Sequence, residues 1–131
     1  MLLVAVAGLD RAAIRAVRYS RLIPATDRRA VHVVNDEDTA FALGSAWMQA
    51  GLADRLRLEM VDPVGTVADS LAVVASDLLN GGAAEVVVLA TQQVGRRPWR
   101  MHRDHTGMEI HREITRVQGA RSLLLDVTGA R

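Results

Sequence analysis

Five short apolar segments alternate along the chain with four longer segments in which apolar residues recur at helical spacing. The short segments are residues 2–7, 30–34, 56–61, 85–90 and 122–127. They are rich in Val and Leu and lack strict alternation of apolar and polar positions. Such strands are typical of a parallel sheet that helices cover on both faces. The pattern therefore predicts one α/β domain over residues 1–131, with a doubly wound, five-stranded parallel sheet and four helices.

Residues that favour the start of a helix precede each of the four helical segments. Asp10 is a good N-cap, and residues 36–38 bring acidic side chains to the first turn of the second helix. The Thr-x-x-Asp sequence at 66–69 and the Thr-x-x-Glu sequence at 106–109 both have the spacing of a capping box. These signals support the helical interpretation of the segments that separate the strands.

Right-handed crossovers predict the strand order 3-2-1-4-5, with a topological switch point between the first and fourth strands. Ligands of doubly wound domains bind at this point, beyond the carboxyl ends of the strands. The segments that leave the two strands are residues 7–10 and 91–106. The candidate ligand-binding residues are accordingly Gly8, Leu9, Asp10, Thr91, Arg97, Arg100, Thr106 and Gly107.

The composition restricts the function classes that remain. The 131 residues include no cysteine, which excludes disulfides and thiolate metal sites and fits a reducing, cytoplasmic location. The apolar segments have the length of strands, well below the ~20 residues of a bilayer span. A net charge of +1 argues against wholesale binding to nucleic acid or membranes, so we expect no nucleic-acid partner.

Residues 96–103 form an arginine-rich segment around Trp99. Guanidinium groups match phosphate and carboxylate, and an aromatic ring can stack on a base. If this segment lies over the switch point, it could bind a nucleotide or another anion. The alternative is a solvated loop whose Trp99 packs on the domain surface or in a dimer.

Histidines near the last helix raise the question of a metal site, because imidazole and carboxylate are ligands of zinc and manganese. The spacing of these residues is unspecific, and Glu109 is expected to cap the helix. We predict no metal and no cofactor, and we expect His32, inside the second strand, to be buried and hydrogen-bonded. The residues considered as metal ligands are His102, Asp104, His105, Glu109 and His111.

The opening residues 3–17, the second-strand residues 31–34 and the long loop before the last helix together resemble the universal stress protein superfamily. The resemblance covers essentially the whole chain. A closer resemblance is to the stress-protein-like cytoplasmic domain of bacterial amino-acid permeases. Those domains open with a segment similar to residues 6–12 and carry a loop with Trp and His before the last helix. The matching loop residues here are Pro98, Trp99, His102 and His105.

The resemblance implies an ATP site made by an acidic residue after the first strand and a glycine-rich loop after the fourth. Ala7 stands where the acid is expected, and only Gly95 and Gly107 occur in the loop region. Conventional ATP binding is therefore not expected. The chain also lacks a cysteine nucleophile, a Walker loop and a Gly-x-Ser-x-Gly elbow, so we predict that it is not an enzyme. Metal-dependent hydrolysis would require the histidine-rich loop to bind a metal.

The functional hypothesis is a non-enzymatic regulatory or interaction domain, in the context of a membrane transporter such as an amino-acid permease. The alternative is a small-molecule-binding protein of the stress type that captures an anion through residues 96–103. We also predict a homodimer through the fifth strand, because an apolar edge strand invites pairing with a second copy. Leu123, Leu124 and Leu125 are the expected contact residues.

Overall fold

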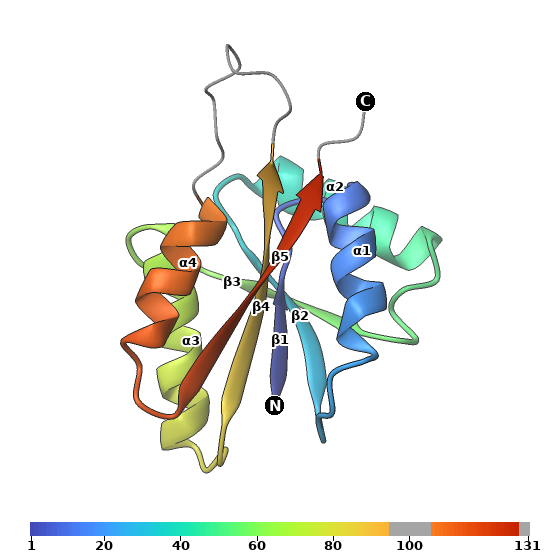
Figure 1. Ribbon diagram of the computed structural model, residues 1–131. Helices are drawn as coiled ribbons and strands as arrows, with labels where there is room; N and C mark the ends of the chain where they lie inside the picture. The colour runs from blue at the N-terminus through green and yellow to red at the C-terminus, as the bar shows by residue number, and fades with distance from the viewer. Residues whose placement is uncertain (95–105, 129–131) are drawn as a thin grey trace.

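The computed structural model describes residues 1–94 and 106–128, and Figure 1 shows their arrangement. A parallel five-stranded sheet with the order β3-β2-β1-β4-β5 forms its centre, which confirms the predicted fold class and strand order. The elements in chain order are β1 (Leu2–Ala5), α1 (Arg11–Ser20), β2 (Arg28–Val33), α2 (Glu37–Gln49), β3 (Arg57–Val61), α3 (Val67–Asn80), β4 (Val86–Val94), α4 (Thr106–Thr115) and β5 (Ala120–Thr128).

Two helices cover each face of the sheet, α1 and α2 on one side and α3 and α4 on the other (Figure 1). Leu2 and Val4 of β1 pack in the core under α1 and α2, whereas Leu3 packs in the core under α3 and α4. Successive side chains of a strand point to opposite faces. A strand between two helical layers therefore needs apolar residues at every position, which explains the uninterrupted apolar segments of the sequence.

The helix starts follow the sequence signals. Asp10 Oδ1 accepts a hydrogen bond from the Ala13 N–H at 2.9 Å and caps α1. Thr66 and Asp69 form the predicted capping box of α3, in which each side chain accepts from the other residue's backbone N–H. These caps satisfy backbone donors that an isolated helix end leaves unpaired.

The largest difference from the predicted strand bounds is at the carboxyl end of the fourth strand. The predicted apolar segment ended at residue 90 and was followed by a long loop, but β4 continues to Val94 and pairs with β5 as far as Thr128. Backbone hydrogen bonds between paired strands do not require apolar side chains. The polar composition therefore marked the end of the buried part of the strand and not the end of the pairing.

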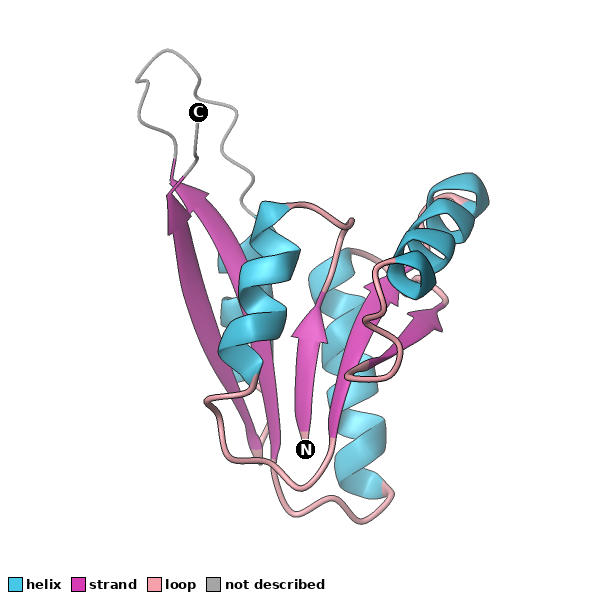
Figure 2. Ribbon diagram, turned by 90° about the vertical axis from the view of Figure 1, so that its right-hand side faces the viewer, coloured by secondary structure: helices cyan, strands magenta, loops and turns pink. Residues whose placement is uncertain are grey.

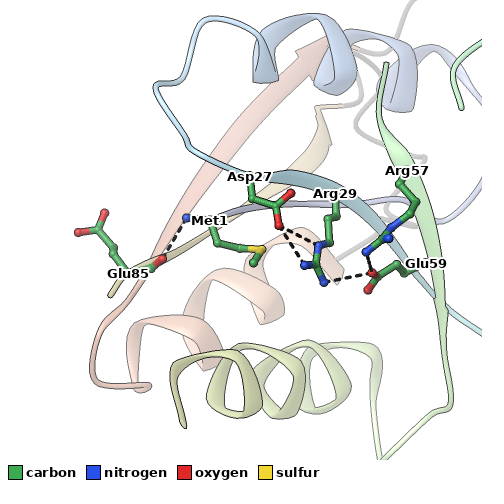
Figure 3. Close-up of polar contacts among 6 residues, drawn as sticks. All are labelled: Met1, Asp27, Arg29, Arg57, Glu59 and Glu85. Atoms are coloured by element: carbon green, nitrogen blue, oxygen red, sulfur yellow. Dashed lines mark hydrogen bonds and ion pairs between the residues drawn. The ribbon is translucent and has the colours of Figure 1, made fainter. Parts of the chain in front are cut away.

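Charged side chains link the amino ends of β2 and β3 on the face that α3 covers (Figure 3). The Arg29 guanidinium contacts the Asp27 carboxylate at 2.9 Å and the Glu59 carboxylate at 3.1 Å, and Arg57 contacts the same Glu59 at 2.7 Å. Such partly exposed pairs contribute little stability individually. The cluster lies at the opposite end of the sheet from the switch point.

Candidate functional site

A pocket of about 290 Å³ lies beyond the carboxyl ends of β1, β2 and β4. It therefore occupies the switch point that the strand order predicts. Its inner wall is apolar and comes from the strands and from the first turns of α3 and α4. The apolar wall residues include Ala5, Val33, Val67, Leu71, Ala90 and Ile110.

His32 brings an imidazole to the wall of this pocket. His32 as a whole is only 5% exposed, and its Nδ1 lies 2.8 Å from the Val6 carbonyl oxygen. Because a carbonyl oxygen can only accept, Nδ1 carries the hydrogen in this contact. The expectation of a buried, hydrogen-bonded histidine is confirmed, and the ring also lines the pocket.

Asp36 places a carboxylate at the pocket, at the start of α2. Its carboxylate accepts hydrogen bonds from the Thr39 hydroxyl at 2.6 Å, the Thr39 N–H at 3.2 Å and the Asp38 N–H at 3.3 Å. The Thr39 hydroxyl is the main cause of a lowered pKa of Asp36, and the two backbone N–H groups lower that pKa further. Among the described lining residues, Asp36 is the one that carries a full charge at neutral pH.

The first turn of α4 closes the pocket on the side of β4. Gly107 is buried, and a Cβ at this position would overlap the Thr91 carbonyl oxygen and lie 3.1 Å from the Leu124 side chain. The absence of a side chain therefore allows the start of α4 to lie directly on the end of β4. Thr91, Thr106 and Gly107 line the pocket together as a consequence of this approach.

The predicted ligand-binding residues are only partly brought together. Thr91, Thr106 and Gly107 line the pocket, whereas Gly8, Leu9 and Asp10 do not, because β1 ends at Ala5 and the residues that line the cavity after it are Val6 and Ala7. Asp10 instead caps α1. Arg97 and Arg100, with the rest of the arginine-rich segment 96–103, lie outside the described residues.

Sequence reasoning missed the contribution of the second strand and the start of α2. The strand order 3-2-1 places β2 beside β1, so the residues that follow β2 also reach the switch point. The acidic run at 36–38 was assigned only to the first turn of the second helix, although its position after β2 was a usable signal. The lining residues missed in this way are His32, Asn35, Asp36 and Thr39.

The histidines considered as metal ligands are not assembled by the described part of the chain. His111 Nδ1 lies 2.9 Å from the Ser122 hydroxyl of β5, which gives this ring a structural partner. His102, Asp104 and His105 fall outside the described residues. Within residues 1–94 and 106–128, no three His, Asp or Glu side chains gather in a group that could hold a metal.

The leucines expected to form a dimer contact differ in their surroundings. Leu123 is exposed, whereas Leu124 packs against the core under α3 and α4, and Leu125 packs against the core under α1 and α2. This follows from the two-residue period of a strand that helices cover on both faces. Leu123 is thus the leucine of this group that is available at the surface.

A family model described as the KimA potassium transporter C-terminal domain matches residues 1–123 of the chain. No curated protein matches it. In the described residues, no helix is long and apolar enough to cross a membrane.

The family match corrects the resemblance drawn from the sequence. The assignment to the universal stress protein superfamily, and to the domain of amino-acid permeases, was wrong, because the matched family is the C-terminal domain of a potassium transporter. The residues that carried the resemblance, 6–12 and 31–34, form a strand, a turn and a capped helix. Many doubly wound domains contain these same elements. The residues are therefore evidence for the fold and not for the family.

Proposed function

The chain belongs to the family of KimA potassium transporter C-terminal domains, and from this membership we propose that it is the cytoplasmic regulatory domain of a potassium transporter. The observation that carries the proposal is the extent of the family match, which includes every described element except the end of β5. In the proposed role, the domain binds a ligand or partner, and this binding changes the activity of the membrane-embedded part of the transporter.

We propose that this role is not enzymatic. The sequence offers no cysteine nucleophile and no motif for phosphate transfer or hydrolysis. His32 is engaged by the Val6 carbonyl, and Asp36 by the first turn of α2. Binding in the pocket is supported by its apolar wall and its hydrogen-bonding groups, which are typical of small-molecule sites.

The first test is the cellular context of the domain. Cells that express the native gene with a C-terminal tag are separated into membrane and soluble fractions. We expect the tag on a polypeptide that stays in the membrane after carbonate washing, with the tag accessible only from the cytoplasmic side. A soluble 14.2 kDa polypeptide that copurifies with no transporter would contradict the proposal.

The second test links the pocket to transport. Ala7 lines the pocket and is exposed, so Ala7→Trp adds a large ring to the pocket without replacing a core residue. Ala84→Trp is the matched control, because Ala84 is exposed at the opposite end of the sheet, just before β4. We expect Ala7→Trp, and not Ala84→Trp, to change potassium uptake by the complete transporter in a strain that depends on it. Equal uptake by both variants would argue against regulation through the pocket.

The second candidate function is the capture of a nucleotide or another anion at this pocket. The start of α4 favours it, because the N–H groups of a helix N-terminus carry partial positive charge. The Asp36 carboxylate opposes it, and the described lining supplies no cationic side chain. An anionic ligand would therefore depend on residues between β4 and α4, where Arg97 and Arg100 occur in the sequence.

We further propose that the domain associates with a second copy of itself. The predicted contact was the fifth strand, and β5 is an edge strand of the sheet. Because Leu124 and Leu125 pack inside their own domain, a contact at β5 would use Leu123 and the backbone edge. Light scattering at about 50 μM protein tests the association. A monomer at that concentration would contradict it.

A further inference from the structure

The outer side of α1 carries basic and apolar side chains and no acidic one. Arg11, Arg15 and Arg18 are spaced i, i+4 and i+7, which places them on one side of the helix, and the opposite side packs in the core. Arg21 and Leu22 continue this surface in the turn that follows α1. The surface is called here the α1 face, and its exposed residues are Arg11, Ile14, Arg15, Arg18, Arg21 and Leu22.

The described part of the chain leaves the α1 face open. In Figure 2, α1 lies in front of the sheet with its outer side toward the viewer, and no other described element lies over it. Leu22 is 77% exposed and Ile14 is 40% exposed. The face therefore offers aliphatic surface directly beside its guanidinium groups, a combination that suits a partner with both anionic and apolar parts.

The positive charge of the α1 face is not neutralised by nearby carboxylates. Between Asp10 and Asp27 the chain has four arginines and no acidic residue. Both flanking carboxylates are engaged, because Asp10 accepts from the Ala13 N–H at 2.9 Å and Asp27 pairs with Arg29 at 2.9 Å. Within the described residues, the four guanidinium groups of the α1 face form no ion pair. Their charge is thus available to a partner.

The helices on the other side of the sheet have a different charge pattern. On α4, Arg116 is paired with Glu113 at 3.1 Å, and α3 carries Asp69 and Asp77 with no basic residue. The net charge of +1 is therefore a balance between surfaces of different sign and does not describe α1. An anionic surface would attract the α1 side of the domain and repel the α3 side, which would orient the domain.

The family context and the composition of the face select a bilayer as the partner. The chain belongs to a family of transporter C-terminal domains, and the proposed function places it beside a membrane. Acidic phospholipids make the cytoplasmic surface negative, and each basic residue near it strengthens binding about fivefold. Guanidinium groups bind phosphate, and their apolar stems let Ile14 and Leu22 reach the headgroup region. A nucleic acid would supply phosphates but no apolar layer for Leu22.

We infer that the α1 face binds the anionic phospholipid surface of the membrane, with the four arginines on lipid phosphates and Leu22 in the headgroup region. The inference rests on the proposed function for the presence of a bilayer. It assigns a surface that is separate from the pocket, because none of the six residues of the α1 face lines that pocket.

Co-sedimentation with vesicles tests the inference. We expect the chain to bind phosphatidylcholine vesicles that contain about 40% phosphatidylglycerol at about 100 mM salt, and not vesicles of phosphatidylcholine alone. Arg15→Glu with Arg18→Glu should weaken binding at least tenfold. The matched control is Arg112→Glu with Arg116→Glu near α4, which changes the net charge equally and should leave binding within about threefold. All four positions are exposed, so the Tm of each variant should stay near that of the wild type.

A fluorescent label provides an independent measurement, because the chain has no cysteine of its own. An environment-sensitive dye on Leu22→Cys should brighten with the phosphatidylglycerol vesicles, whereas the same dye on Val73→Cys of α3 should not. No binding to these vesicles, equal losses in the two double variants, or a response at Val73→Cys alone would overturn the inference. So would binding to a DNA duplex by a chain that binds no vesicles.

These failures are distinct from a failure of the proposed function. The vesicles contain no transporter, so a chain that does not bind them would leave the transporter assignment standing. That assignment fails instead when the tagged native polypeptide is soluble and copurifies with no transporter, whatever the vesicles show.

Discussion

At the scale of single residues, the pocket depends on how closely Gly107 approaches the end of β4. A methyl group in Gly107→Ala would overlap the Thr91 carbonyl oxygen and crowd Leu124. Overpacking of this kind costs about 1–3 kcal/mol, because the first turn of α4 must move away from the sheet. Gly8→Ala is the control, since nothing lies within 4 Å of a Cβ there. Urea unfolding of both variants checks the prediction, and equal stability would contradict it.

Asp36 gives the start of α2 a pH dependence whose sign follows from its hydrogen bonds. The folded state lowers the pKa of Asp36 below the usual 3.8, chiefly through the Thr39 hydroxyl. The stabilisation is therefore complete above the unfolded-state pKa, and it is lost as the pH falls through the lowered folded-state pKa.

Asp36→Asn keeps an acceptor for the cap and removes the titration. We expect wild type to be more stable than Asp36→Asn at about pH 6 and the difference to shrink at about pH 2.5. The free energy of unfolding of the two proteins at both pH values provides the measurement. A difference that stays constant between these pH values would show that the carboxylate charge does not contribute to the cap.

At the scale of elements, Ser70 fixes the start of α3, which supplies Val67 and Leu71 to the pocket wall. The Ser70 hydroxyl is buried, accepts from the Val64 N–H at 2.8 Å and contacts the Thr66 carbonyl at 2.8 Å. Ser70→Ala leaves the Val64 N–H without this acceptor and should cost about 0.5–1.5 kcal/mol. Ser76→Ala, also on α3, is the matched control. Thermal unfolding should show a lower Tm only for Ser70→Ala.

The sequence was sufficient to predict the order of the elements, because each strand contains a short apolar segment and each helix begins at a polar residue that favours its start. Gly107 was also predicted at the site, although the reason for a glycine there became visible only in its approach to Thr91. The extension of β4 to Val94 was missed, since backbone pairing continues where the side chains turn polar. His32 and Asp36 were missed as lining residues because their pattern also fits a buried strand and a helix cap.

At the scale of the whole molecule, the fold and the family carry different information. The strand order places a pocket at the switch point in any doubly wound domain, so it predicts where a ligand binds and not which ligand. Only the family match connects this chain with potassium transport. Asp36 and Thr39 line the pocket at the start of α2, and later residues of the same helix line a separate groove with β3.

The last prediction concerns the source of positive charge for an anionic ligand. The described lining contributes the Asp36 carboxylate and neutral groups, so binding of an anion should depend on Arg97 and Arg100. Their joint replacement by Ala should cost about 2–4 kcal/mol of affinity, since each charged hydrogen bond contributes about 1.5–3 kcal/mol and the losses are not fully additive. Arg11→Ala with Arg15→Ala, on the exposed face of α1, is the matched control. Thermal-shift screening with nucleotides and acidic metabolites identifies the probe, and calorimetry of the two double variants measures the loss. Equal affinities, or probes that are only cationic or apolar, would show that the arginine-rich segment does not serve the pocket.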